Sequence, residues 1–112
     1  MHLSLIALCL LNFWPAPAAN PAAPEYCYLE GAVYVEEVAA FAKYRVYVQD
    51  IESFADLVVY REESESFADA PGRWYITDNR AFADFSIHIE EVENFADFSI
   101  AYTDFRSAAG CK

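Results

Sequence analysis

The sequence predicts an all-β (β-rich) domain in which six strand-and-corner repeats form one compact unit. Three observations support this fold class. A Phe-Ala pair returns at a nearly constant step along the chain, a short alternating apolar run precedes each pair, and no segment after residue 24 makes a convincing helix. Strand-like runs at regular short spacing are typical of β-repeat proteins.

The repeat has a period of 13 residues with one irregular step. Its Phe-Ala pairs begin at Phe41, Phe54, Phe67, Phe82 and Phe95, and Ala108 marks the sixth unit. The successive steps are 13, 13, 15, 13 and 13 residues. The long step contains Pro71-Gly72, which is a two-residue insertion of turn type. Such self-similarity indicates that one structural unit is repeated.

Each unit opens with a predicted strand of about five residues, rich in Val, Ile, Tyr and Phe. The runs are GAVYV (31–35), YRVYV (44–48), LVVYR (57–61), GRWYI (72–76), FSIHI (85–89) and FSIAY (98–102). Side chains alternate between the two faces of a strand. The predicted core face carries Val33, Val35, Tyr44, Val46, Val48, Leu57, Val59, Trp74, Ile76, Phe85, Ile87, Ile89, Phe98 and Ile100. The other face carries Tyr34, Tyr47, Tyr60, Tyr75, His88 and Ala101, either as a tyrosine ladder at the surface or as a second, thinner core layer.

The connections between strands share one pattern. An acid follows each strand, then a few polar or mixed residues, then Phe-Ala-Asp or a variant of it. We expect each Phe to be an anchor packed back under the sheet. We expect Asp56, Asp69, Asp84 and Asp97 to accept turn N–H groups before the next strand. The segment 36–44 resembles a helix in isolation, but its register makes it another corner.

The N-terminal segment has the order of a secretory signal peptide. The first 24 residues contain no Asp, Glu, Lys or Arg, and the apolar run from Leu3 to Trp14 is shorter than the roughly 20 residues of a membrane span. Small residues at 16–18 fit a cleavage site. We predict a signal peptide at 1–18 (cleaved within 16–24), a short linker at 19–27 and a β-repeat domain at 28–112, with an uncleaved anchor as the alternative. The protein is then secreted or periplasmic, with no membrane span after cleavage.

Charge and cysteine content restrict the class of protein. The chain has 18 acidic and 7 basic residues and a net charge of −11, which argues against nucleic acid and anionic membranes as partners. Cys27 and Cys111 stand at the two ends of the predicted domain. In an exported protein they can form a disulfide, worth roughly 4–5 kcal/mol in the chain-entropy estimate. Two free thiols are the alternative.

Several stretches resemble the septoil-knot domain family. They are VYVQDIESFADLVVYREESESFADAPG, WYITDNRAFADFSIHIEE and YTDFRSAAG, and the resemblance covers about Tyr28 to Lys112. It implies a small β-rich domain whose backbone is threaded into a deep seven-crossing torus knot. Periodicity alone indicates only a β-solenoid-like or compact repeat. The chain departs from the family pattern in placing Phe before Ala-Asp and in largely lacking Lys after Asp. The family implies no catalytic residues.

The sequence offers no strong catalytic or cofactor site. It lacks a Gly-rich phosphate loop, and His88, with Ser86 on the same strand face, is more simply a substitute for Tyr in the ladder. We therefore expect no enzyme and no cofactor. The acids that end the strands form a column that is a weak candidate for calcium, or else solvated turns. They are Glu37, Asp50, Glu63, Asp78, Glu91 and Asp104.

Two interpretations of function remain open. The first is an exported, very stable structural module of unknown role, expected to be a monomer. The second is a binding module for a protein or glycan that uses the face of Tyr34, Tyr47, Tyr60, Tyr75 and His88, or the acidic column. An exposed aromatic stripe favours the second interpretation, and burial of the same residues favours the first. The partner is unknown.

Overall fold

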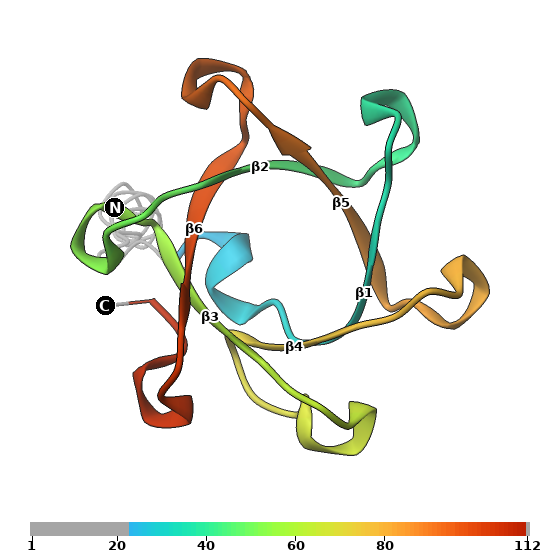
Figure 1. The fold of residues 1–112 in the computed structure, drawn as a ribbon, viewed down its shortest axis with the longest axis vertical. Coiled ribbons are helices and arrows are strands. Elements are labelled where there is room, and N and C mark those ends of the chain that lie inside the picture. The colour runs from blue at the N-terminus through green and yellow to red at the C-terminus, as the bar shows by residue number, and fades with distance from the viewer. Residues whose placement is uncertain (1–22, 112) are drawn as a thin grey trace, which may run out of the picture.

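A computed structural model describes residues 23–111 and shows six strands closed into a parallel barrel (Figure 1). The predicted signal peptide at 1–18 lies outside the described residues. The strands are β1 (Gly31–Val35), β2 (Tyr44–Val48), β3 (Leu57–Arg61), β4 (Arg73–Ile76), β5 (Phe85–Glu90) and β6 (Phe98–Thr103). Three strands have the predicted bounds, and the other three differ by one residue at one end. The all-β prediction is confirmed.

The strand order around the barrel is β1-β4-β3-β6-β2-β5, and all six pairings are parallel. Among consecutive strands, only β3 and β4 are neighbours. Every other connection passes one strand before the chain re-enters the sheet (Figure 1). The solenoid-like alternative is therefore wrong, because in a solenoid successive strands lie side by side. Closure of the sheet leaves no long unpaired edge.

The Pro71-Gly72 insertion lies in the one connection that joins neighbouring strands. The Gly72 N–H donates to the Leu29 carbonyl at 3.0 Å, and the Gly72 carbonyl accepts from the Tyr60 N–H at 2.9 Å. Gly72 has a φ of 82°, and a Cβ built on it lies 2.4 Å from the Gly110 nitrogen. The Gly72 backbone contacts the segments around Leu29, Tyr60 and Gly110, and only glycine fits at this position.

The predicted core face is confirmed with one exception. Most of its members fill the barrel, and the buried core cluster consists of Val33, Val46, Leu57, Val59, Trp74, Ile87, Phe98 and Ile100. Val35, Tyr44, Val48, Ile76 and Phe85 are partly buried against this core. The exception is Ile89, which is 40% exposed because it lies at the open end of β5.

Short 3-10 turns form the corners that project outward from the barrel (Figure 1). They are η2 (Ala39–Phe41), η3 (Glu52–Phe54), η4 (Glu65–Phe67), η5 (Arg80–Phe82), η6 (Glu93–Phe95) and η7 (Arg106–Ala108), and the segment before β1 forms η1 (Glu25–Tyr28). Residues 23–111 contain no α-helix, so the helix-like segment 36–44 is a corner, as predicted.

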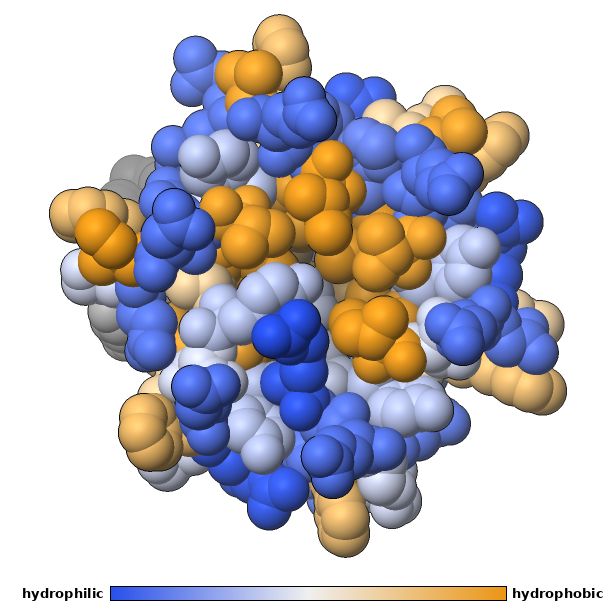
Figure 2. All heavy atoms as spheres, in the orientation of Figure 1, coloured by the Kyte–Doolittle hydropathy of each residue, from blue (hydrophilic) through white to orange (hydrophobic). Residues whose placement is uncertain are grey.

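The prediction that the corner phenylalanines pack under the sheet is wrong. The five Phe side chains are between 56% and 67% exposed. Each of these Phe residues is the last residue of a turn, and its backbone N–H donates to the carbonyl oxygen three residues earlier. Phe41, for example, donates to the Val38 carbonyl at 3.0 Å. The turn needs no side-chain anchor, and its outer position points away from the barrel. Apolar side chains accordingly stand at the rim of the molecule in Figure 2.

The segment around η1 closes the barrel at the end where the strands begin. Tyr26 stacks on Phe98 with ring centroids 4.7 Å apart, and the Trp74 indole N–H donates to the Leu29 carbonyl at 3.0 Å. Residues 25–27, which the sequence places in the linker, pack into the domain. The aromatic starts of the strands need this cover because they face the barrel interior.

Candidate functional site

The acidic column does not gather into a site. Its six members are all exposed and lie one at the end of each strand. Among residues 23–111, no group of three or more His, Cys, Asp or Glu side chains is placed to hold a metal ion. Because the barrel is closed and one of these carboxylates follows each strand, they are distributed around the barrel.

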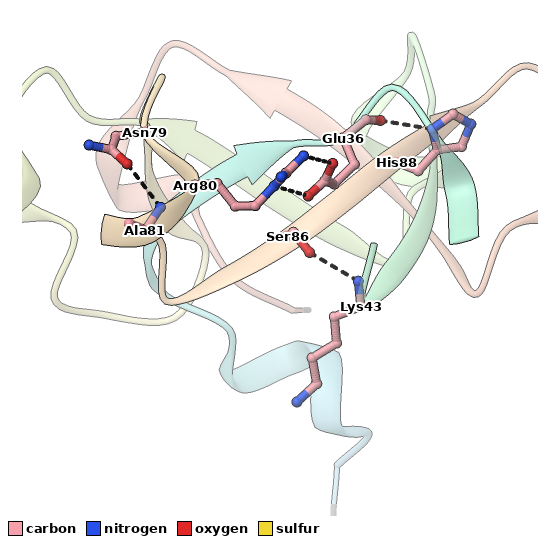
Figure 3. A network of polar contacts seen from close by, with 7 residues as sticks. All are labelled: Glu36, Lys43, Asn79, Arg80, Ala81, Ser86 and His88. Atoms are coloured by element: carbon pink, nitrogen blue, oxygen red, sulfur yellow. Dashed lines mark hydrogen bonds and ion pairs between the residues drawn. The ribbon is translucent and has the colours of Figure 1, made fainter. Parts of the chain in front are cut away.

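Two other carboxylates, which are not among the predicted site residues, are buried and paired with arginines. Glu36 accepts two hydrogen bonds from Arg80 at 2.7 and 2.8 Å, and Glu62 accepts two from Arg106 at 2.9 Å each. Both glutamates are about 5% exposed or less. Each pair joins the end of one strand to a distant corner, as Figure 3 shows for Glu36 and Arg80. We call these two pairs the Glu-Arg latches.

Each latch extends onto the tyrosine face. The guanidinium carbon of Arg80 lies 5.2 Å from the Tyr34 ring centroid, and that of Arg106 lies 5.4 Å from the Tyr60 centroid. The hydrogen bonds to the buried glutamates raise the pKa of both arginines above its ordinary value. A signal for the latches was present in the sequence, since both pairs are 44 residues apart and occupy equivalent repeat positions.

The tyrosine face is half-buried instead of forming an open stripe. Tyr34, Tyr47, Tyr60 and Tyr75 are all intermediate in exposure, as is His88, while Ala101 is buried. Two of the rings are covered by latch arginines. The face is therefore intermediate between the exposed ladder and the buried layer that the sequence allows.

His88 and Ser86 are engaged with different backbone groups. The His88 Nδ1 lies 2.9 Å from the Glu36 carbonyl oxygen, and the Ser86 hydroxyl accepts the Lys43 N–H at 3.1 Å (Figure 3). His88 Nε2 is 4.0 Å from a carboxylate oxygen of Glu90. No bond between the Ser86 and His88 side chains is present in this arrangement, which is not that of a nucleophile and its base.

Three corner aspartates accept backbone N–H groups, but from a different strand and not from their own turn. Asp84 accepts from Ala32 at 2.7 Å, and Asp97 accepts from Arg45 at 2.7 Å. Asp56 accepts the Ser99 N–H at 2.9 Å. The fourth, Asp69, instead lies 3.7 Å from Arg73. The local-turn prediction is wrong because parallel strands from distant units begin beside each corner.

The end of the barrel opposite η1 is lined by apolar side chains. The inward-facing residues there are Val35, Val48, Ile76 and Ile89, together with Arg61, whose guanidinium lies 4.1 Å from the Tyr102 ring centroid. We call Val35, Val48, Ile76, Ile89, Arg61 and Tyr102 together the barrel mouth. On the face shown in Figure 2, apolar side chains gather over the middle of the barrel and hydrophilic ones surround them.

Cys27 and Cys111 form the predicted disulfide, with 84 residues of sequence separation and Cα atoms 5.4 Å apart. The bond joins η1 to the C-terminal segment, which pairs with β3 through Val58 and Gly110. Both ends of the repeat are thus fixed at the same place.

No helix within residues 23–111 is long and apolar enough to cross a membrane. Comparison with curated proteins and with solved structures found no match. Comparison with protein families matches residues 26–112 to the 7(1) septoil knot domain. The match spans all six repeats. The chain therefore belongs to the septoil knot domain family, and its domain is a knotted β-repeat closed by a disulfide.

Proposed function

We propose that this chain is an exported structural module whose knotted, disulfide-closed domain resists unfolding and proteolysis. The observation that carries the proposal is the bond between Cys27 and Cys111, which joins the two ends of the knotted segment. A knot in an open chain can be lost at a free end, whereas a knot in a closed loop persists until a covalent bond breaks. Such a domain is expected to have high kinetic stability.

The distribution of polar groups supports a structural role. Within residues 23–111, every buried side-chain nitrogen or oxygen has a hydrogen-bond partner. The buried carboxylates of Glu36 and Glu62 bind corner arginines, and His88 and Ser86 bind backbone groups. These groups stabilise the fold, and we propose no catalytic step for them. A disulfide also fits export, because such bonds persist in oxidising compartments.

Limited proteolysis tests the proposal. Chymotrypsin is a suitable protease because the exposed corner phenylalanines offer it a site at five corners. We expect the oxidised full chain, exported from its host, to survive at least tenfold longer than the Cys27→Ser/Cys111→Ser variant under native conditions. Equal lifetimes of the two proteins, or rapid cleavage of the oxidised chain, contradict the proposal. Retention of the chain in the cytoplasm contradicts export.

A further inference from the structure

The two ends of the barrel differ in how they are covered. At the end where the strands begin, η1 covers the aromatic side chains, and Tyr26 and Leu29 pack against the core. At the opposite end, the barrel mouth has no corresponding cover from the described residues, and Ile89 is 40% exposed. An uncovered apolar floor is a feature of interaction surfaces more than of monomer surfaces.

The apolar part of the mouth is continuous. Ile76, Val35, Ile89 and Val48 belong to β4, β1, β5 and β2, which are four successive strands in the barrel order. The remaining two strands carry Arg61 and Tyr102, whose stacked side chains close that side of the mouth. The partly exposed aliphatic surface is thus a patch bounded on one side by the Arg61-Tyr102 pair.

A hollow extends this patch outward along β5. It has a volume of about 390 Å³ and adjoins the mouth through Ile89. Its lining combines apolar side chains from the strand end and corner η6 with acidic ones, and comprises His88, Ile89, Glu90, Glu91, Val92 and Phe95. An elongated ligand with an apolar side chain can therefore lie in the mouth and continue outward past two carboxylates.

Charge identifies the kind of partner. The four strands that form the patch are followed by the exposed carboxylates of Glu37, Asp50, Asp78 and Glu91. Three cations lie near this end of the barrel. Arg80 is bonded to Glu36, Arg45 lies 3.8 Å from Glu90, and Arg61 stacks on Tyr102 at the side of the mouth away from the patch. A nucleic acid, an anionic lipid surface or a second copy of this chain each brings negative charge against this rim. A cationic partner is complementary to it.

We propose that the barrel mouth binds a basic peptide segment that carries aliphatic or aromatic anchors between lysine or arginine residues. An anchor contacts Val35, Val48, Ile76 and Ile89, and the flanking cations lie against the rim carboxylates. This binding activity goes beyond the structural role proposed above and uses a surface that the role does not need. The two can fail separately, since protease resistance does not depend on the mouth.

The test uses the oxidised full chain and a fluorescein-labelled ten-residue peptide with leucines at its centre and two lysines at each end. We expect the peptide to bind with a dissociation constant below about 1 mM and to bind more weakly as salt is raised. We expect the amide signals that shift on binding to belong to the ends of β1, β2, β4 and β5. Peptides with glutamate in place of lysine, or serine in place of leucine, should not bind.

A pair of isoleucine variants provides the matched control. Ile89→Ser changes the mouth, whereas Ile51→Ser changes an equally apolar side chain that is 52% exposed before corner η3. We expect Ile89→Ser to weaken binding at least tenfold and Ile51→Ser to leave it unchanged. Absence of binding, equal loss in the two variants, shifts confined to the corners, or preference for anionic vesicles would each overturn the proposal. The amide map on the unmodified chain decides the matter if a variant fails to fold.

Discussion

Single side chains in this domain stabilise it by joining units that are distant in sequence. Asp56 shows the pattern, because it accepts the Ser99 N–H while its own N–H lies 3.0 Å from the Ser99 hydroxyl oxygen. Tyr44 makes a similar long-range contact, since its hydroxyl donates to the Glu25 carboxylate at the cap of the barrel. Bonds of this kind to a charged acceptor are stronger than neutral ones.

The Tyr44 contact predicts a specific loss of stability at high pH. Burial and then the hydrogen bond to Glu25 raise the pKa of Tyr44 to about 12, above the value of 10.0 for a free tyrosine. The unfolded chain therefore loses this proton first as the pH rises. The contribution of Tyr44 is fully present below pH 10 and is lost between about pH 10 and 12.

Denaturant unfolding of the wild type and of Tyr44→Phe at pH 9, 10 and 11 measures this effect. We expect the free energy of unfolding of the wild type to fall more steeply over this range than that of the variant. Tyr28→Phe, which changes a tyrosine that is 60% exposed, serves as the control and should follow the wild type. Parallel pH profiles for the wild type and Tyr44→Phe would show that the hydroxyl contact does not stabilise the fold.

At the scale of the element, the corners are fastened to strands that do not neighbour them in sequence. The Glu62-Arg106 latch ties η7 to the end of β3, and the Glu36-Arg80 latch ties η5 to the end of β1. The Asn79 side chain further supports η5 by accepting the Ala81 N–H at 2.9 Å (Figure 3). A buried charge is tolerated only when it is paired, so the partners depend on each other.

We predict strong coupling between Glu62 and Arg106. Arg106→Gln leaves the Glu62 carboxylate buried without its cation and should lower the melting temperature by on the order of 5 °C or more. Adding Glu62→Gln to that variant should restore part of the loss, because the uncompensated charge is removed. Thermal melts of the two single variants and the double variant form a cycle that gives the interaction.

Glu63→Gln is the matched control for this cycle, because Glu63 is the exposed neighbour of Glu62. It should leave the melting temperature within a degree or two. If the losses in Arg106→Gln and Glu62→Gln simply add in the double variant, the latch does not act as a coupled pair.

Alternation and period predicted the elements well. The strands and their inward faces follow from Val, Ile and aromatic residues at every second position, and the contrast between buried Val46 and half-buried Tyr47 confirms that reasoning. The prediction for Phe54 was wrong, because the repetition of a corner residue does not indicate whether its side chain points inward or outward. The cap formed by Tyr26 was missed because it precedes the first repeat.

The arrangement of the strands could not be predicted from the period. A step of 13 residues is compatible with pairing between successive strands, yet β1 pairs with β4 and β5. The resemblance to the septoil-knot family supplied the threading. The 44-residue spacing of the latches reflects this pairing of non-consecutive strands. It corresponds to three repeats, plus the two-residue insertion, plus the few residues that separate the end of a strand from its corner arginine. The barrel mouth likewise becomes visible only once four non-consecutive strands are placed side by side.

At the scale of the whole molecule, the disulfide and the knot act together. The bond closes a loop whose ends are 84 residues apart, which is worth roughly 4–5 kcal/mol in the chain-entropy estimate. That estimate treats the unfolded chain as an unknotted loop. In this protein the closed loop also retains the knot, so the unfolded chain has the same knot topology as the native one.

This combination predicts that the oxidised chain remains knotted when it is denatured. The Cys27→Ser/Cys111→Ser variant has free ends at which the knot can be lost, and it must then be threaded again through contacts that are distant in sequence, which is slow. Both proteins are held in concentrated guanidinium for times from minutes to days, diluted, and followed by tryptophan fluorescence. We expect the refolding rate of the oxidised chain to be independent of the time in denaturant. The variant should gain a slower phase whose amplitude grows with that time. A growing slow phase in the oxidised chain would show that something other than loss of the knot limits refolding, and its absence from both proteins would show that threading does not.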